Sequence, residues 1–248
     1  MLRSKSLKPR LRLVSEKVPQ CMSVYDIGSD HAYLPINLIS QNRCKSAFAT
    51  DIKDGPLFIA NKNIISYGLE NKIFTVKGDG LAVVSPDAHD SCIVVSGMGG
   101  LLVKAILISG LEKAYNSRRL ILQPMNCCSI VRQMLLLNKL SIEDEELIRE
   151  GQHIYTVMSA SMDSEVCKPS IEDIYIGKKL LEKRDPLLPY FLDKEINKIE
   201  KIFTGFSASD ASITVKTLQH GEYRGITLFR LAEIKSAMIR EKEKAMKG

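Results

Sequence analysis

The sequence contains no apolar run that approaches the roughly 20 residues of a transmembrane helix. Its N-terminus, MLRSKSLKPRLRLV, lacks the uninterrupted apolar segment of a secretory signal. These absences predict a soluble protein without a membrane partner, and we expect it in the cytoplasm. With 248 residues, 45% of them hydrophobic, the chain is long enough for one sizeable α/β domain and a smaller appendage.

The usual signatures of metal binding are also missing. The six cysteines show no Cys-x-x-Cys spacing, and the adjacent pair Cys127 and Cys128 suits neither a disulfide nor a zinc site. The sequence has no His-Glu-x-x-His motif, no histidine cluster and no EF-hand loop. We therefore expect reduced, mostly buried thiols and no bound metal.

Basic residues are concentrated at the start of the chain. The formal net charge is +6, and five basic residues precede the first acid, Glu16. These residues are Arg3, Lys5, Lys8, Arg10 and Arg12. Such a segment fits contact with a nucleic acid and equally fits a solvated helix face, so charge alone leaves both interpretations open.

Short apolar segments alternate with segments of helical periodicity between about residues 22 and 125, which is typical of βαβ units around a parallel sheet. The expected strands are Met22–Ile27, Ser46–Asp51, Lys72–Lys77, Ser91–Ser96 and Arg119–Gln123. The expected helices are Tyr33–Ser40, Gly55–Tyr67, Gly100–Ser109 and Ser129–Asn138. Segments Ser141–Glu150 and His153–Ala160 then predict a terminal antiparallel pair. The fold class is therefore α/β, a doubly wound sheet with an antiparallel edge strand.

The composition changes after residue 162. The polar stretch MDSEVCKPS, residues 162–170, predicts a linker, so we divide the chain into domains 1–162 and 163–248. Two apolar stripes follow, Leu192, Ile196, Ile199, Phe203 and Phe206, and then Leu228, Leu231, Ile234 and Met238. Heptad spacing of this kind packs helices together, and it predicts a C-terminal α-helical coiled-coil lobe of two antiparallel helices.

The first expected strand runs into DIGSDH, residues 26–31. In doubly wound folds a glycine turn at this position lies against a bound nucleotide. A GxGxxG loop would indicate a dinucleotide phosphate, but only Gly28 is present here. Asp26 is unfavourable beside a diphosphate and favourable beside the ammonium and sulfonium groups of S-adenosyl-L-methionine. We therefore predict this cofactor, in contact with Asp26, Gly28 and Ser29.

Two further acids follow the next two strands. Asp51 ends the second strand, where an acid can accept both ribose hydroxyls, and Asp79 stands between two glycines, where it can accept the adenine amino group. Either acid alone is as readily the N-cap of a helix. Three acids at successive strand ends together favour a methyltransferase. The predicted cofactor contacts in this part are Asp51, Ile52, Gly78, Asp79 and Gly80.

The fourth strand leads into SGMGG, residues 96–100. The glycines provide backbone donors and allow close approach to a ligand, and a simple turn into a helix would need fewer of them. We add Gly97, Met98 and Gly99 to the predicted cofactor contacts, with Met98 facing the cofactor or only capping the core.

The segments DIGSDHAYLP, TDIKDGP, GDGL, VVSGMGG, LILQP and EGQHIY, in this order, resemble the bacterial tRNA adenine N1-methyltransferase family that modifies adenine-22 in the D-arm. The resemblance implies a Rossmann-like class I methyltransferase domain, S-adenosyl-L-methionine as cofactor and N1-methyladenosine in tRNA as product. The family reads LQPN after the fifth strand, whereas this chain reads LQPMN. This departure leaves open the base contact expected of Asn126.

Methyl transfer to adenine N1 requires alignment more than activation, because N1 already carries a lone pair. A carboxylate bonded to the N6 amino group would orient the base and offset the positive charge that develops on the ring. Asp30 is the candidate catalytic residue, since it lies beyond Gly28 and the resemblance points to the same position. The alternative is that Asp30 caps the next helix. His31 and Tyr33 are candidate substrate contacts, with a structural hydrogen bond and core packing as their alternatives.

The target base of a folded tRNA must be exposed while basic groups hold the backbone. We assign this task to the N-terminal segment of a monomer, with Arg10 and Arg12 as predicted contacts. The C-terminal lobe would help through Lys178, Lys179, Lys183 and Arg184.

Three other interpretations have less support. A Rossmann dehydrogenase would need a GxGxxG loop, and a noncatalytic RNA-binding protein would not need intact acids at three strand ends. Methylation of another RNA adenine position is a third alternative. Its exocyclic N6 form lacks the expected Asp/Asn-Pro-Pro-aromatic motif.

Overall fold

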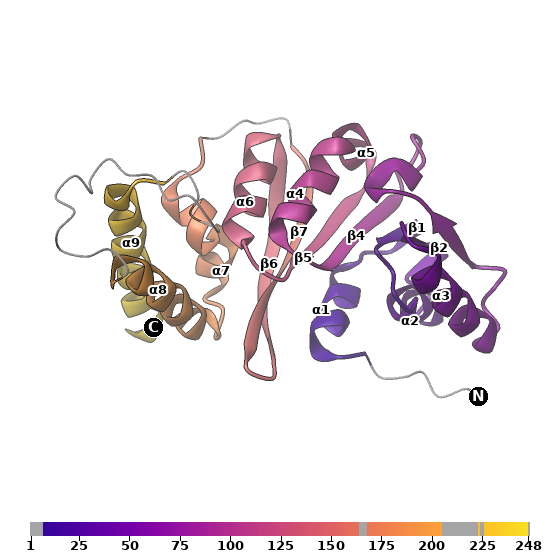
Figure 1. The fold of residues 1–248 in the computed structure, drawn as a ribbon, viewed down its shortest axis with the longest axis horizontal. Helices are drawn as coiled ribbons and strands as arrows, with labels where there is room; N and C mark the ends of the chain where they lie inside the picture. Colours follow the sequence, from indigo (N-terminus) through magenta and orange to yellow (C-terminus); the bar gives the residue numbers. More distant parts are fainter. Residues whose placement is uncertain (1–6, 164–167, 205–222, 224–225, 248) are drawn as a thin grey trace.

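The computed structural model describes residues 7–163, 168–204, 223 and 226–247 (Figure 1). Its strands are β1 (Cys21–Ile27), β2 (Cys44–Asp51), β3 (Ile73–Lys77), β4 (Ser91–Met98), β5 (Arg119–Pro124), β6 (Leu140–Glu150) and β7 (His153–Met162). They form one seven-stranded sheet in the order β3-β2-β1-β4-β5-β7-β6. β7 is antiparallel to both of its neighbours, and the other adjacent pairs are parallel.

Helices cover both faces of the sheet (Figure 1). They are α1 (Pro9–Lys17), α2 (Tyr33–Ser40), α3 (Asp54–Ser66), the short 3₁₀ helix η1 (Gly80–Val83), α4 (Gly100–Ser109), α5 (Leu111–Asn116) and α6 (Cys128–Leu137). Alternate strand residues point to opposite faces, so Val94 packs with α1, α2 and α3, whereas Ile93 packs with α4, α5 and α6. Burial on both faces explains the continuous apolar run of β4.

The register aligns the carboxyl ends of the central strands. Ile27 of β1 lies beside Thr50 of β2 and Val95 of β4. The strand order reverses between β1 and β4, and doubly wound sheets bind ligands at the carboxyl edge at such a point. The loops that carry the sequence motifs therefore meet at this edge.

The remaining described helices form a lobe beside β6 and β7, at the opposite end of the molecule from α2 and α3 (Figure 1). They are the π-helix η2 (Glu172–Ile176), α7 (Lys178–Lys183), α8 (Leu188–Thr204) and α9 (Leu228–Lys247). Both predicted apolar stripes belong to one hydrophobic cluster, apart from Phe206, which lies outside the described residues. Lys235 lies 2.9 Å from Glu200, and Lys242 pairs with Asp193, so α8 and α9 are antiparallel.

The predicted fold class is confirmed, and the strand ends differ from expectation by at most two residues. Several features differ. The short helix η1 was not predicted, and the C-terminal lobe contains η2 and α7 in addition to the two predicted helices. The helix α5 was not expected, because six residues are too short to show a helical period. The antiparallel strand β7 lies one position inside the edge, and β6 forms the edge itself, because the hairpin folds back onto β5. The division into domains at residues 162 and 163 stays a prediction.

Candidate active site

A cavity of about 550 Å³ opens at the carboxyl ends of β1 and β4. Its walls are the start of α1, the loop from β1 to α2, and the end of β4. The sequence-predicted residues that line it are Arg10, Asp26, Gly28, Ser29, Asp30, His31, Tyr33 and Gly97. The fold therefore gathers three separate parts of the sequence around one space.

Asp26 contributes a buried carboxyl group to this cavity. Its side chain is 7% exposed, and burial raises its pKa from 3.8 to about 6, although a contact with Ser29 opposes the shift. No cation of the described residues forms an ion pair with it. A cationic group of a ligand would thus gain a strong contact at Asp26.

Glycine is required in the loop after β1. Gly28 and Gly97 both have a left-handed φ of +76°. A Cβ atom at Gly28 would also collide with the methyl group of Met98. Met98 does not line the cavity but packs against the hydrophobic cluster under α4. The structure thus shows Met98 in contact with the core, and the cofactor contact predicted for it stays a prediction.

Asp30, His31 and Tyr33 form the mouth of the cavity. The Asp30 side chain is 68% exposed, and its Oδ2 lies 3.1 Å from Nε2 of His31. The His31 ring stacks on the Tyr33 ring, with centroids 5.2 Å apart. The N-cap of α2 is Ala32, which has a left-handed φ of 54° and no capping side chain. The alternative that Asp30 caps α2 is therefore wrong, and its carboxylate is accessible.

Five other predicted cofactor residues lie at or just after the ends of β2 and β3 and outside the lining of the cavity: Asp51, Ile52, Gly78, Asp79 and Gly80. Asp51 Oδ1 accepts a hydrogen bond of 2.8 Å from the Lys53 backbone, and the Gly78 N–H donates to the Asp51 carbonyl at 3.0 Å. Neither Asp51 nor Asp79 caps a helix with its side chain. Both acids thus stand at the same edge of the sheet as Asp26.

Asn126 is placed away from the cavity. Its Oδ1 accepts a hydrogen bond of 3.1 Å from the Gly100 N–H, so the carboxamide holds the first turn of α4, whose N-cap is Gly99. Asn126 lines a smaller pocket between the loop after β5 and α8. The base contact predicted for it stays a prediction.

Arg10 and Arg12 face different surroundings. Arg10 lines the cavity, its Nη1 donates to Gln123 Oε1, and its guanidinium lies 5.5 Å from the centre of the Tyr155 ring. Arg12 is exposed on the same helix. Of these two arginines, only Arg12 thus has the exposure expected of a contact to a tRNA backbone.

The sequence analysis did not identify Gln123, which contacts two residues of the cavity wall, Arg10 and Gly97. Gln123 is fully buried at the end of β5, and its Oε1 also accepts a hydrogen bond of 3.0 Å from the Gly97 N–H. Its Nε2 donates to the Pro124 carbonyl at 2.9 Å. Gln123 therefore ties α1 to the turn after β4. The sequence feature that could have identified Gln123 is a polar residue at the end of an otherwise apolar strand.

Two of the basic residues expected at the tRNA surface are paired with acids. Lys179 lies 2.9 Å from Glu182, and Lys183 pairs with Asp144, which Lys17 of α1 contacts at 2.7 Å. Lys178 and Arg184 are exposed. Arg3 and Lys5 lie outside the described residues.

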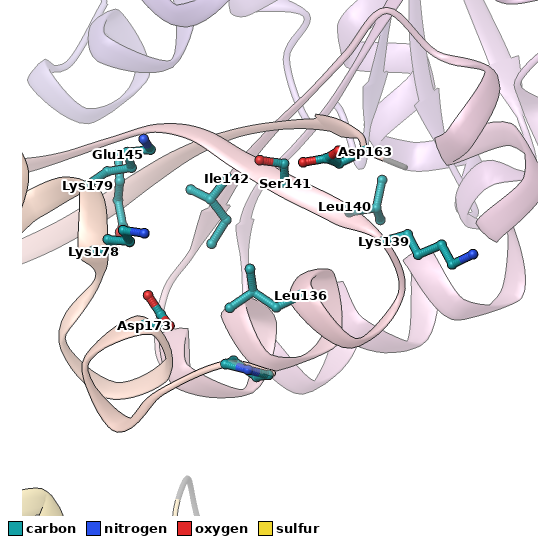
Figure 2. A pocket seen from close by; sticks show the side chains of 11 residues that line it. Leu136, Lys139, Leu140, Ser141, Ile142, Glu145, Asp163, Asp173, Lys178 and Lys179 are labelled. Carbon is teal, nitrogen blue, oxygen red and sulfur yellow. The ribbon is translucent and has the colours of Figure 1, made fainter. Parts of the chain in front are cut away.

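A separate pocket of about 200 Å³ lies between α6, β6 and α7, and none of the predicted cofactor residues lines it (Figure 2). Glu145 on its wall forms an ion pair with Arg132 of α6, with 2.7 Å between Oε1 and Nη2. Both side chains are 1% exposed. Burial raises the pKa of Glu145, and Arg132 opposes this shift. Arg132 also donates to the Ile174 carbonyl at 3.1 Å, so the pair joins the sheet to the C-terminal lobe.

In the part of the chain that the structure describes, no group of three or more His, Cys, Asp or Glu could hold a metal ion. Within the same ranges, no helix is long and apolar enough to cross a membrane. Cys21, Cys44 and Cys92 are buried free thiols, as expected. Cys127 and Cys128 are free and partly exposed, and Cys167 lies outside the described residues.

Comparisons with known proteins agree with the geometry. A family model described as TrmK, tRNA (adenine(22)-N(1))-methyltransferase, matches residues 24–221. The Bacillus subtilis tRNA (adenine(22)-N(1))-methyltransferase is 36% identical over 62% of this chain, and the match spans 64% of that relative, less than two thirds of its length. The Streptococcus pneumoniae protein Sp1610, solved in complex with S-adenosyl-L-methionine, is 30% identical, with a TM-score of 0.78 over 94% of this chain and 98% of that one. The B. subtilis TrmK crystal structure is 26% identical, with a TM-score of 0.77 over 97% of this chain and 98% of that one.

Proposed function

Because this chain belongs to the TrmK family of tRNA (adenine(22)-N(1))-methyltransferases, we propose that it methylates N1 of adenine-22 in tRNA with S-adenosyl-L-methionine as the methyl donor. The observation that carries the proposal is the cavity at the ends of β1 and β4, where a buried acid and two left-handed glycines meet. The names of the relatives support the same activity. The dehydrogenase interpretation has no such support.

The residues around the cavity fit the donor. Asp26 supplies a buried carboxyl group for a cation, and Gly28 and Gly97 leave the backbone open to close approach. We assign Ser29 to the same part of the site. For the adenosine part we assign the row at the ends of β2 and β3, namely Asp51, Ile52, Gly78, Asp79 and Gly80, with Met98 and Gly99 shaping the neighbouring turn. When bound, S-adenosyl-L-methionine supplies an electrophilic methyl group on a sulfonium.

Asp30 is the proposed catalytic residue. Its exposed carboxylate at the cavity mouth can accept a hydrogen bond from the adenine N6 amino group. That contact orients N1 and offsets the positive charge that methylation places on the ring. His31 holds Asp30 through the contact at 3.1 Å, and Tyr33 supports the His31 ring by stacking. The stacked pair also offers an aromatic surface to an unstacked base.

The exposed basic residues next to the cavity favour a polyanionic substrate. Lys8 and Arg12 are exposed on the α1 segment, and Lys8 lines the cavity mouth. We propose that these residues contact the tRNA backbone, with Lys178 and Arg184 of the lobe as more distant contacts. A tRNA substrate also fits the cytoplasmic location and the monomeric state that we predict.

The test is a methylation assay with tRNA transcripts. The protein is incubated with S-adenosyl-L-methionine and a transcript that has adenine at position 22, and the digested nucleosides are analysed by mass spectrometry. We expect N1-methyladenosine. A matched transcript with guanine at position 22 should yield none. N6-methyladenosine, or equal N1-methyladenosine from both transcripts, would contradict the proposed target, and no methylation of either would contradict the activity.

A further inference from the structure

Three buried thiols gather at the amino ends of three neighbouring strands, on the opposite edge of the sheet from the cavity. Cys21 is the first residue of β1, Cys44 is the first residue of β2, and Cys92 is the second residue of β4. All three side chains pack in one hydrophobic cluster, the one under α1, α2 and α3. The proposed methylation uses none of them, so this cluster needs a separate explanation.

Cys21 and Cys44 satisfy the geometric requirement for a disulfide. They are direct partners in the parallel register of β1 and β2. Neighbouring strands lie about 4.8 Å apart, and disulfides join residues whose Cα atoms are about 4.4–6.8 Å apart. Cys92 lies opposite Val24, further along β1 than Cys21. Since a strand rises about 3.3 Å per residue, Cys92 is too far along the strand to be joined to Cys21 without movement of the backbone.

The surroundings of Cys21 favour its thiolate, which is the reactive form of a cysteine. The thiol and the backbone N–H of Cys92 donate hydrogen bonds to the Cys21 sulfur and lower its pKa below the ordinary value of 9.0, although burial opposes this shift. In its neutral form the Cys21 thiol donates to the Ser23 carbonyl at 3.3 Å. Burial raises the pKa of Cys44 to about 12, so Cys44 keeps its proton.

We propose that Cys21 and Cys44 are a redox-active pair that hydrogen peroxide converts into a reversible disulfide, with Cys21 as the nucleophile. The Cys21 thiolate attacks one peroxide oxygen, the O–O bond breaks, and hydroxide leaves, so that Cys21 becomes a sulfenic acid. The Cys44 sulfur then attacks the Cys21 sulfur, and the S–O bond breaks. The hydroxyl group leaves with the Cys44 proton as water. Two thiols are thereby oxidised, and one peroxide is reduced to two molecules of water.

The low exposure of the pair decides which oxidants reach it. Cys21 is 8% exposed and Cys44 is 7% exposed, so a small peroxide fits and a bulky disulfide reagent does not. The disulfide would close the part of the chain that carries β1 and α2, and it would prevent further oxidation of Cys21 to a sulfinic acid. Because the pair lies at the edge away from the cavity, the inference does not depend on the proposed function.

The experiment maps thiols by mass spectrometry after the reduced, full-length protein has been treated with hydrogen peroxide. Remaining thiols are alkylated, and the protein is digested with trypsin. The digest places Cys21, Cys44 and Cys92 in three separate peptides, residues 18–43, 44–45 and 78–104. We expect the first two peptides to be joined after peroxide treatment and to separate again in dithiothreitol.

Variants identify the role of each thiol. Cys44→Ser should abolish the cross-link and leave Cys21 as a sulfenic acid that dimedone traps, because the second thiol is gone. Cys92→Ser is the matched control and should keep the cross-link. Oxidation should raise the midpoint of thermal unfolding of the wild type by roughly 5 °C or more, since a cross-link restricts the unfolded chain, and it should not raise that of Cys44→Ser.

Two results with the wild-type protein would overturn the inference, and neither depends on the folding of a variant. One is that peptides 18–43 and 44–45 stay separate after peroxide treatment. The other is that peptide 18–43 is joined to peptide 78–104 instead. Both results would leave the proposed function intact, because methylation of adenine-22 is measured in the reduced protein.

Discussion

Among the described residues, an arginine and an acid occur together both in a closed contact and in an open cavity, and the two places differ in whether the charged groups meet. Arg132 and Glu145 lie 2.7 Å apart between the sheet and the C-terminal lobe, and each is 1% exposed. Arg10 and Asp26 line an open cavity, and neither has an ion pair among the described residues. The same residue types therefore form a closed structural contact in one place and line an open cavity, the proposed cofactor site, in the other.

The difference shows what marks a binding site. In the closed pair each charge compensates the other, and Gly177 allows the chain of the lobe to pass close by, because a Cβ there would collide with Glu145. In the cavity the charges are held apart, one by the end of β1 and one by Gln123. A charged side chain that is shielded from water and has no oppositely charged partner is the feature that indicates a ligand site.

The largest effect is expected at Asp30, an acid that is neither buried nor paired with an arginine. Asp30→Ala should reduce the methylation rate by roughly 10²- to 10⁴-fold, because it removes the contact proposed to stabilise the developing charge. Calorimetry should show S-adenosylhomocysteine affinity close to that of the wild type. Unchanged turnover would remove Asp30 from the mechanism, and a loss of cofactor affinity would instead place it in the donor site.

The closed pair should matter for stability. Arg132→Met leaves Glu145 buried without its partner and should lower the free energy of unfolding by about 3–5 kcal/mol, measured by denaturant titration. The double variant Arg132→Met with Glu145→Leu should recover much of this loss, because no charge then stays buried. If the single variant is as stable as the wild type, the pair is not the structural contact described here.

At Asp26, in the open cavity, we expect that removing the charge weakens ligand binding but raises the stability of the unliganded protein. Asp26→Asn should weaken S-adenosylhomocysteine binding roughly 10- to 100-fold, because the counter-charge of the ammonium is lost. It should also raise the free energy of unfolding of the unliganded protein at pH 7 by about 1–3 kcal/mol, because an ionised buried carboxylate is removed. A variant that loses both affinity and stability would make Asp26 a structural residue.

The smallest effect is a pH dependence of binding. The pKa of Asp26 is raised to about 6, so the carboxyl group becomes neutral below that pH and stops attracting an ammonium. The affinity for S-adenosylhomocysteine should be greatest near pH 7, where the carboxylate is ionised and the ammonium is protonated, and should fall by up to about tenfold per pH unit below about pH 5. Asp26→Asn should lose this dependence. A flat profile in the wild type would show that Asp26 does not contact the ammonium.

Much of the fold was predictable, because the apolar segments and their spacing are local features. The strands from Cys21–Ile27 to Arg119–Pro124 and the helix Tyr33–Ser40 follow from periodicity and from glycine positions. The position of β7 between β5 and β6 was harder to predict from the sequence, because it depends on which strand the hairpin pairs with in the folded protein. The site was predictable where a residue follows a strand directly, as Asp26 does.

The sequence by itself determined that Asp26, Asp51 and Asp79 stand at one edge of the sheet, because the ends of parallel strands share that edge. Only the tertiary structure decided which charges meet. Arg10 contacts Gln123 across 113 positions of the chain, and that contact turns a residue of a basic N-terminal segment into the wall of a cavity. Pairing and burial of charges depend on packing between distant elements, and no local pattern in the sequence specifies them.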